Sequence, residues 1–289
     1  MTRTFDRIRS VIISWIGGLP LPPRAAARVE FWFAVGYWPR LHNPRTFTEK
    51  VLHRKFFEHD PRMPNLIDKT KVKDHVAARL GSDWVIPTLY EGSALPPVEE
   101  RDWPLPFVIK PNHLSGPIIF ARRQEDLDWP AIEAKCNEWM SSRPHGAQFF
   151  EWGYRHIQPR ILVEEYVGQP GQAPIDYKFY AFRGRVEYLH VHTDREAHHK
   201  IAFFNTKWER LDIRILGIDT DDRPIPRPRS LNEMIRAAEV LSATWPFVRV
   251  DLYEHDGRPK FGELTFYPGA GLSRYRPLAW DFKLGELWQ

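Results

Sequence analysis

Hydrophobic positions recur along the chain at two spacings, one helical and one alternating. Helical spacing predicts helices at residues 46–60, 65–80, 125–142 and about 231–242. Runs of β-branched and aromatic residues predict strands at 84–90, 107–111 and 160–167, and hairpins at 176–193 and 247–266. Thr46 or Thr48 caps the first helix, Gly81 ends the second, and Arg183-Gly184 turns the first hairpin. We therefore expect an α+β or mixed α/β fold in which helices and antiparallel hairpins interleave.

The last hairpin, VRVDLYEHDGRPKFGELTF, carries one carboxylate in each strand, Asp251 and Glu263. Their relation depends on the length of the loop around Asp256-Gly257. An odd loop places Asp251 opposite Glu263 on one face, whereas an even loop points them to opposite faces. Pro259 cannot donate to a ladder, so it favours the longer, odd loop that contains it.

In the odd register, Arg249 and Thr265 share the face of Asp251 and Glu263. Two carboxylates that close repel each other and raise one pKa unless a cation lies between them. Two oxygen ligands, with positions left for phosphate and water, suit Mg²⁺ better than Zn²⁺. The alternative is that Asp251 simply pairs with Arg249 on an exposed hairpin face, and the pattern alone leaves both interpretations open.

Further anion-binding features lie upstream. Lys110 ends an apolar strand, FVIKP, and a turn of small residues, NHLSG, follows it. The backbone N–H groups of such a turn can form an anion nest, although a lysine there can equally be a solvated strand end. Lys69 and Lys73 are four residues apart on one face of the predicted helix, where they contribute to the same site or are surface charge.

Composition narrows the class of protein. The chain has 289 residues and no apolar run near twenty residues, so we expect a soluble globular protein rather than a membrane-spanning one. The single cysteine, Cys136, excludes an internal disulfide, fits a reducing compartment and is expected in the core. The net charge of +4 and the pI near 9.1, with arginines spread along the chain, favour an anionic ligand such as a nucleotide or acidic glycan over nucleic acid.

The amino terminus, FDRIRSVIISWIGGLPLPP, is amphipathic if helical. Its apolar face holds Phe5, Ile8, Ile12, Trp15 and Ile16, with Arg3 and Arg7 roughly opposite. Three interpretations stay open: a helix docked on its own domain, a membrane-surface helix over residues 3–18, or a cleaved signal peptide. The short apolar core and the Pro-rich segment containing Arg24 argue against the signal peptide.

The order of the motifs resembles the ATP-grasp superfamily, and specifically the TupA-like family linked to teichuronopeptide and capsular polysaccharide synthesis. The matching motifs cover about residues 43 to 271 and run in the order NPRTFTEKV, DKTKVKDHV, FVIKPNHLSG, ILVEEYV, DYKFYAFRG, RVDLY and GELTFYPGAG. The resemblance implies an ATP-grasp fold with an N-terminal region at 1–67, a central lid at 68–166 and a C-terminal subdomain with a metal site at 167–289. ATP would lie between the last two.

The resemblance implies nucleotide-binding roles for Lys73, Lys110, His113, Ser115, Gly116, Glu164, Glu165, Val167, Asp176 and Lys178. Among these residues, Lys110 would bridge the α- and β-phosphates, and His113 would belong to the loop that covers the phosphates. The backbone of Glu165 and Val167 would read the adenine edge, and Asp176 would contact the ribose hydroxyls.

The resemblance also implies Mg²⁺ ligation by Asp251 and Glu263, and contact of Arg249 with the transferred phosphate. Many ATP-grasp enzymes have Glu-x-Asn at the second metal position, whereas this chain has Glu263-Leu264-Thr265. Thr265 is expected near the metal, but it offers only a neutral hydroxyl where the amide oxygen would lie.

The segment HVHTDREAHHK offers a second cluster. His190 and His192 alternate on one strand face and His198-His199 follow, so a metal site is conceivable. Alternatively Arg195 and Lys200 help to hold the γ-phosphate or an acidic substrate, or the segment is plain surface.

The resemblance implies a function: an ATP- and Mg²⁺-dependent carboxylate–amine ligase that forms an amide through an acyl phosphate. Its substrate would be a cell-surface or capsular polysaccharide or its precursor, with an acidic glycan or amino acid as partner and no nucleic acid. The alternatives are an ATP-grasp kinase that phosphorylates a glycan hydroxyl and a non-catalytic component of glycan assembly. We expect a cytoplasmic protein, peripheral on the inner face of the membrane if the first helix binds lipid.

Overall fold

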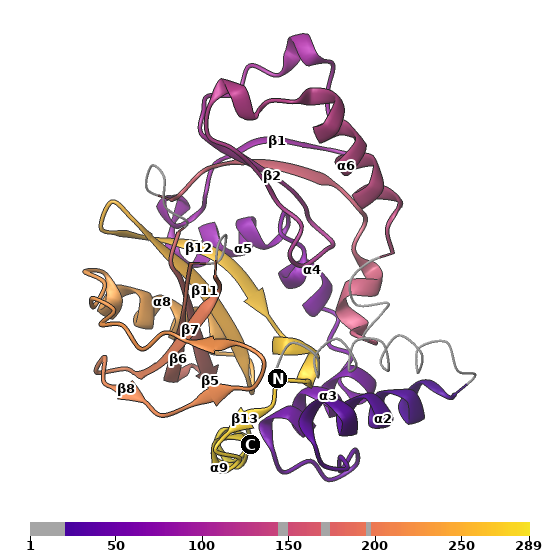
Figure 1. Cartoon of the computed structure of the whole chain (residues 1–289), viewed down its shortest axis with the longest axis vertical. Coiled ribbons are helices and arrows are strands. Elements are labelled where there is room, and N and C mark those ends of the chain that lie inside the picture. Colours follow the sequence, from indigo (N-terminus) through magenta and orange to yellow (C-terminus); the bar gives the residue numbers. More distant parts are fainter. Residues whose placement is uncertain (1–20, 144–149, 169–173, 195–197) are drawn as a thin grey trace.

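The computed structural model of the chain describes residues 21–143, 150–168, 174–194 and 198–289. It contains two large β-sheets, a two-stranded sheet and the helices around them. Figure 1 shows the smaller sheet at one end, the larger sheet in the middle, and helices α2, α3 and α9 at the other end. The mixed α+β class expected from the sequence is confirmed.

The smaller sheet is antiparallel and runs in the order β1-β4-β2-β3. Its strands are β1 (Thr88–Gly92), β2 (Phe107–Pro111), β3 (Ile119–Ala121) and β4 (Ile161–Glu165). Helix α6 (Trp129–Ser141), capped by Asp128, packs its buried side chains Ile132 and Cys136 against this sheet. Burial raises the pKa of Cys136 to about 11, so this thiol belongs to the core, as expected.

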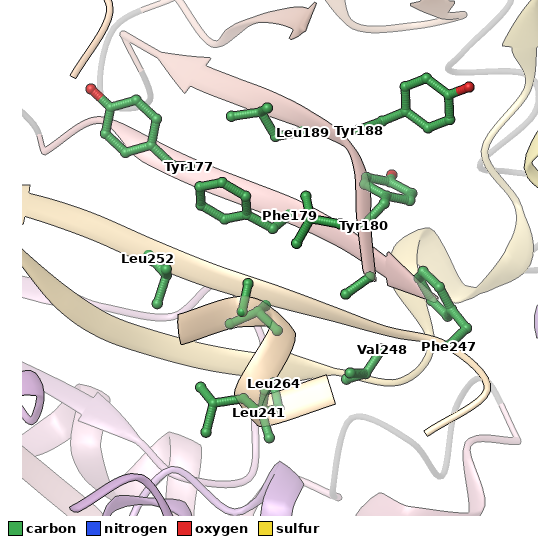
Figure 2. Close-up of a cluster of buried hydrophobic side chains, with 14 of the residues drawn as sticks. Tyr177, Phe179, Tyr180, Tyr188, Leu189, Leu241, Phe247, Val248, Leu252 and Leu264 are labelled. Atoms are coloured by element: carbon green, nitrogen blue, oxygen red, sulfur yellow. The ribbon is translucent and has the colours of Figure 1, made fainter. Parts of the chain in front are cut away.

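The larger sheet runs in the order β10-β7-β6-β5-β11-β12, with β8 also paired to β7. Its strands are antiparallel except for β10, which is parallel to β7. They span β5 (Asp176–Phe182), β6 (Arg185–Thr193), β7 (Lys200–Asn205), β8 (Arg210–Leu211), β10 (Asp219–Thr220), β11 (Val248–His255) and β12 (Arg258–Thr265). Alternation gives the sheet one apolar face, where Phe179 and Leu252 lie near Leu241 of α8 (Leu231–Ser242), as Figure 2 shows.

Most predicted elements are present, and some bounds differ. The hairpin turn at Arg183-Gly184, the strand at 107–111 and the helix at 231–242 are confirmed. Helix α3 (Phe47–Phe57) begins at Thr46, whose hydroxyl accepts from the backbone N–H of Glu49 at 3.2 Å, while the Glu49 carboxylate accepts from the N–H of Thr46. This capping box selects Thr46 over Thr48 as the N-cap.

The single helix predicted at 65–80 is wrong. The chain forms two short helices, α4 (Met63–Ile67) and α5 (Val72–Leu80), separated by a turn. Asp68 causes the break, because one of its carboxylate oxygens accepts from both the backbone N–H and the hydroxyl of Thr70, at 3.0 and 2.9 Å. The amide of Asn112 donates to the same oxygen at 3.0 Å and ties this turn to the end of β2.

Helix α5 packs with the larger sheet rather than the smaller one. Its side chains Val72 and Val76 are buried in the same cluster as the strands of the larger sheet. The subdomain boundaries at 67 and 166 stay a prediction.

The sequence did not predict helices α2 (Pro23–Val35) and α9 (Ala279–Leu287). Both lie at the end of the molecule opposite the smaller sheet (Figure 1). Asp281 of α9 is buried and accepts three hydrogen bonds: from the backbone N–H of Thr48 at 2.9 Å, from its hydroxyl at 2.6 Å, and from the Tyr37 hydroxyl at 3.0 Å. These bonds hold α9 to the first turn of α3 and to the loop after α2. The short connectors β9 (Arg214–Ile215) and β13 (Tyr275–Arg276) pair nearby.

Burial raises the pKa of Asp281 from an ordinary 3.8 to about 6. The folded protein therefore binds this proton more tightly than the unfolded chain, so the contribution to stability is full below about pH 4 and is lost as the pH rises through 6. The side chain introduced in the variant Asp281→Asn cannot ionise. Between pH 4 and pH 7 we therefore expect the wild type to lose about 2 kcal/mol of unfolding free energy relative to this variant. Urea denaturation at a series of pH values measures this difference, and parallel curves for the two proteins would contradict the prediction.

Candidate functional site

The two carboxylates of the last hairpin lie opposite each other, as predicted, but for a different reason. Asp256-Gly257 forms a two-residue turn with φ of 51° and 74°, so the odd loop favoured by Pro259 is wrong. A regular ladder from this turn would pair Asp251 with Gly262. A β-bulge at Gly262 supplies one extra residue and moves Glu263 opposite Asp251. The glycine directly before Glu263 is the sequence signal that could have indicated this bulge.

The register of the larger sheet gathers polar side chains into rows across neighbouring strands. Asp251 pairs with Glu263 on one side and with Lys178 on the other, and Lys178 pairs in turn with His190. By alternation, these residues project from the face opposite Phe179 and Leu264. The sheet therefore builds a polar floor from four strands, β12, β11, β5 and β6.

Asp251 is the centre of this floor. Its side chain is only 2% exposed, and its two oxygens accept from Nε and Nη2 of Arg249, both at 2.7 Å. The ammonium of Lys178 forms an ion pair with the same carboxylate. Burial by itself would raise the pKa of Asp251, but Arg249 and Lys178 outweigh it and hold the pKa below its ordinary value. Asp251 thus pairs with Arg249, as one interpretation of the sequence had it, but in a buried site instead of on an exposed face.

Thr265 is bonded to both of its charged neighbours. Its hydroxyl donates to Glu263 at 3.0 Å and accepts from Arg249 at 2.9 Å. Glu263 remains about one third exposed, with Arg249 at 3.4 Å. The structure therefore gives Thr265 an orienting contact with Glu263, and metal ligation by Thr265 stays a prediction.

A second buried carboxylate lies on the smaller sheet. Glu164 of β4 forms ion pairs with Lys73 of α5, at 2.6 Å, and with Lys110 of β2. Burial by itself would raise the pKa of Glu164, but Lys110 and Lys73 outweigh it and lower the pKa. Burial lowers the pKa of Lys73, and Glu164 opposes that shift. Because Lys73 belongs to α5, this bridge also links the smaller sheet to an element packed on the larger one.

Lys69 is a residue whose role the sequence left open between site and surface. The break between α4 and α5 removes it from the helix and turns it toward the loop after β2, where its ammonium donates to the carbonyl of Leu114 at 2.7 Å. Burial lowers its pKa, and the charge of Glu263 opposes that shift. The signal that could have placed it is the Asp68-Lys69-Thr70 sequence, because Asp and Thr favour turns over helix interiors.

A cavity of about 250 Å³ lies between the two charged clusters. Its walls bring together Lys69, Lys110 and Lys178 with Asp251 and Glu263, and the loop after β2 contributes Ser115 and Gly116. Phe120 and Tyr253 add aromatic surface, and Gly262, the bulge residue, brings backbone to the wall. The structure thus places six of the predicted site residues around one cavity: Lys110, Ser115, Gly116, Lys178, Asp251 and Glu263.

Other predicted residues lie beside this cavity or away from it. The His113 ring is buried, with its nitrogens 3.3 Å from the Asn112 side-chain oxygen and 3.1 Å from the carbonyl of Trp139, so it faces α6 instead of covering the cavity. The backbone N–H of Glu165 donates to the carbonyl of Pro87 at 3.2 Å.

Two more of the predicted nucleotide contacts already have partners. The carbonyl of Val167 lies 3.0 Å from a ring nitrogen of His255. Asp176 is buried and lies 3.4 Å from the Lys178 ammonium.

The histidine segment is only partly brought together. His192 and His199 have ring nitrogens 2.7 Å apart, and the His190 and His192 ring centroids are separated by 4.6 Å. Burial lowers the pKa of His190 and His192 well below the ordinary value, so both rings are neutral. Among the described residues, no group of three or more His, Cys, Asp or Glu side chains is arranged to hold a metal ion. Lys200 begins β7 away from the cavity, and Arg195 lies outside the described residues.

Comparison with protein families matches residues 49–289 to the TupA-like ATP-grasp family. No curated protein sequence matches the chain. Among solved structures, D-alanine–D-alanine ligase from Bacillus anthracis is 17% identical, with a TM-score of 0.42 over 71% of this chain and 57% of its own length. L-amino acid ligase from Bacillus licheniformis is 14% identical, with a TM-score of 0.45 over 78% and 50%. The ATP-grasp ligase PsnB, complexed with minimal precursor, Mg and ADP, is 15% identical, with a TM-score of 0.40 over 76% and 57%. The alignments therefore span between 50% and 57% of the length of these three proteins.

Glu164→Gln tests the bridge between the sheets. The amide cannot neutralise Lys73 and Lys110, so two partly buried ammonium groups would face each other, and we expect a loss of about 2 kcal/mol in the free energy of unfolding at neutral pH. The pKa of Glu164 is lowered in the folded protein. The stabilisation from the ionised carboxylate is therefore present above the ordinary pKa of glutamate and is lost as the pH falls through the lowered pKa. Urea unfolding at pH 7 and pH 4 measures both effects. Glu165→Gln, at the exposed neighbour, is the matched control, and equal losses in the two variants would refute the bridge.

Proposed function

This chain belongs to the TupA-like ATP-grasp family, and on that premise we propose that it is an ATP- and Mg²⁺-dependent ligase that joins a carboxylate to an amine. The observation that carries the proposal is the cavity in which Lys69, Lys110 and Lys178 face the opposed carboxylates of Asp251 and Glu263. A triphosphate needs cations along its length and oxygen ligands for its metal, and this cavity offers both within about 250 Å³.

We assign the triphosphate to the lysine side of the cavity. Lys110 and Lys69 line it directly, and Lys73 reaches Lys110 through their shared partner Glu164. The loop at Ser115-Gly116 has room for a phosphate, since Gly116 has a φ of 101° and no atom within 4 Å of the position that a Cβ would take. The backbone of Glu165 and Val167 would border the adenine edge, and Asp176 would reach the ribose hydroxyls.

Asp251 and Glu263 are the type of ligand that Mg²⁺ prefers. Both are oxygen ligands, they lie opposite each other in the ladder, and Arg249 and Lys178 keep Asp251 ionised. Mg²⁺ bound there would cancel charge on the phosphate oxygens during transfer. Thr265 would hold Glu263 in position through their hydrogen bond.

The proposed reaction needs no covalent bond between protein and substrate. The protein has to align the substrate carboxylate with the γ-phosphate and to neutralise the negative charge between them. A substrate carboxylate oxygen bonds to the γ-phosphorus as the bond to the β-phosphate oxygen breaks, which releases ADP and leaves an acyl phosphate. The amine nitrogen then bonds to the carbonyl carbon, the carbon–oxygen bond to phosphate breaks, and the amine loses a proton. Arg249 is held in advance by Asp251 and Thr265, so it can meet the charge of the transferred group without reorganisation.

The substrate class rests on the family alone. We propose that the acid or the amine belongs to a cell-surface or capsular polysaccharide, or its precursor, with an acidic glycan or an amino acid as partner and the reaction in the cytoplasm. Within the described ranges, no helix has the length and hydrophobicity needed to cross a bilayer. Contact of residues 3–18 with a membrane lies outside the described residues and stays a prediction.

Hydroxylamine trapping tests the reaction. Protein, ATP and Mg²⁺ incubated with uronic-acid or amino-acid acceptors should yield a hydroxamate, because hydroxylamine intercepts the acyl phosphate, whereas a kinase would phosphorylate a hydroxyl and give none. Asp251→Asn should lower turnover by about a hundredfold or more. Glu263→Gln should do the same with less risk to folding, since this side chain is one third exposed.

The matched control is Asp256→Asn, because this exposed turn residue has a positive φ that asparagine also tolerates. Circular dichroism should confirm that each variant is folded. Turnover that is unchanged in both Asp251→Asn and Glu263→Gln would remove the metal assignment, and ATP consumption without any hydroxamate would remove the ligase assignment.

Lys69→Met tests the residue that the structure adds to the predicted site. It removes one positive charge from the cavity and the bond that fixes the carbonyl of Leu114, so we expect binding of MgATP to weaken about tenfold. Isothermal titration calorimetry measures the dissociation constant. Lys71→Met, two residues along and exposed, is the control and should leave the constant unchanged. Equal affinities for the two variants would exclude Lys69 from the site.

A further inference from the structure

The positive charge of the chain is concentrated ahead of the family-matched region. Residues 1–48 contain seven arginines against two acidic residues, Asp6 and Glu30, a net charge of +5. The whole chain carries +4, so residues 49–289, which match the family, together carry −1. The excess basic charge therefore belongs to the N-terminal stretch and not to the nucleotide site.

The same stretch holds an unusual share of exposed apolar surface. Of the eleven large apolar side chains that are exposed among the described residues, four lie within residues 21–38, and they are Leu21, Trp32, Phe33 and Trp38. We call these four residues the N-terminal apolar patch. Trp38 is 57% exposed and Trp32 is 47% exposed, values that are high for indole rings in a folded domain.

Helix α2 carries two residues of this patch, Trp32 and Phe33. One side of the helix packs into the protein through Phe31, Ala34 and Val35. On the other side Trp32 and Phe33 are exposed with ring centroids 4.8 Å apart, and Val29, one turn earlier, is half-buried. The acidic residue of the helix, Glu30, is buried, whereas its two arginines, Arg24 and Arg28, are exposed and half-buried, so the outer side is apolar beside basic charge. A surface helix of a globular protein normally turns a polar side outward, and this one does not.

The chain in front of α2 continues the same chemistry in its sequence. Residues 1–20 lie outside the described residues, and they carry Arg3, Arg7 and Arg9 with an apolar set at helical spacing, namely Phe5, Ile8, Ile12, Trp15 and Ile16. This set ends at Ile16, seven residues before α2 begins at Pro23.

We propose that residues 21–45 dock the protein on an anionic lipid surface. Trp32, Phe33 and Trp38 would enter the boundary between headgroups and acyl chains, where indole rings are favoured because one end is apolar and the other polar. The arginines would meet the anionic headgroups, which attract basic segments over about a Debye length. Apolar side chains flanked by cations, with the nearby carboxylate buried, match this boundary in both hydrophobicity and charge. The proposal is independent of the ligase activity, because it concerns residues outside the nucleotide site.

Vesicle sedimentation with the full chain tests the proposal. We expect binding to vesicles of equimolar phosphatidylcholine and phosphatidylglycerol, and at least tenfold weaker binding to phosphatidylcholine alone. Raising the salt to roughly 0.5 M should weaken the binding to anionic vesicles, because it screens the arginines. The double variant Trp32→Ser/Phe33→Ser should bind anionic vesicles about tenfold more weakly, and Trp38→Ser alone should also weaken binding.

Val98→Ser/Leu216→Ser is the matched control, because these side chains are 49% and 47% exposed and lie elsewhere on the protein. Its vesicle binding should equal that of the wild type, and ATP turnover in solution should be the same in all variants. Wild-type protein that fails to sediment with anionic vesicles, or a double variant that binds as tightly as the control, would overturn the proposal. If the double variant instead lost thermal stability while the wild type bound no vesicles, residues 5–16 covering α2 would replace lipid as the occupant.

Discussion

The architecture of the site depends on one buried carboxylate held by two cations. Asp251 lies almost fully out of water, where an unpaired charge would be very costly, and Arg249 and Lys178 remove that cost through close ion pairs. Each of these partners belongs to a fixed position in the same sheet, Arg249 two residues along β11 and Lys178 directly opposite on β5. Correct pairing of β5 and β11 is therefore a condition for neutralising Asp251, and the pairing of β12 with β11 presents Glu263 to the cavity.

The smaller sheet repeats this arrangement with its own residues. Glu164 is buried and lies between Lys73 and Lys110, so each sheet contributes one carboxylate that orders two cations at the edge of the cavity. The two clusters differ in where their partners come from. All of the Asp251 partners are in the larger sheet, whereas Lys73 comes from α5, which packs on that sheet and reaches across to the smaller one. The cavity is thus bordered on one side by strands of the larger sheet and on the other by residues of the smaller sheet that α5 helps to hold in place.

The success and failure of the sequence predictions follow the range of the interactions involved. Strand 107–111, helix 231–242 and the Arg183-Gly184 turn were predictable because apolar spacing and turn residues act locally. The helix predicted at 65–80 failed because Asp68 bonds to Thr70 and to Asn112, the latter 44 residues away in sequence. Helix α2 was not predicted because its outer side is apolar. The alternation of apolar and polar positions that predicts a surface helix is therefore weak in its sequence. The error at 65–80 also affected Lys69. The single predicted helix placed it on a helix surface, whereas Asp68 places it in a turn.

The sequence alone determined the classes of element, the order of the motifs and the identity of Lys110, Asp251 and Glu263 as candidate ligands, because these depend on residue type and on spacing within one segment. It could not determine which of the candidates share a cavity. That depends on the bulge at Gly262, the break at Asp68 and the direction in which the His113 ring is buried, each of which involves contact with another segment of the chain. Side chains alternate with a period of two in a strand, so one extra residue in a ladder exchanges the two faces, and only the folded sheet decides which face each carboxylate takes.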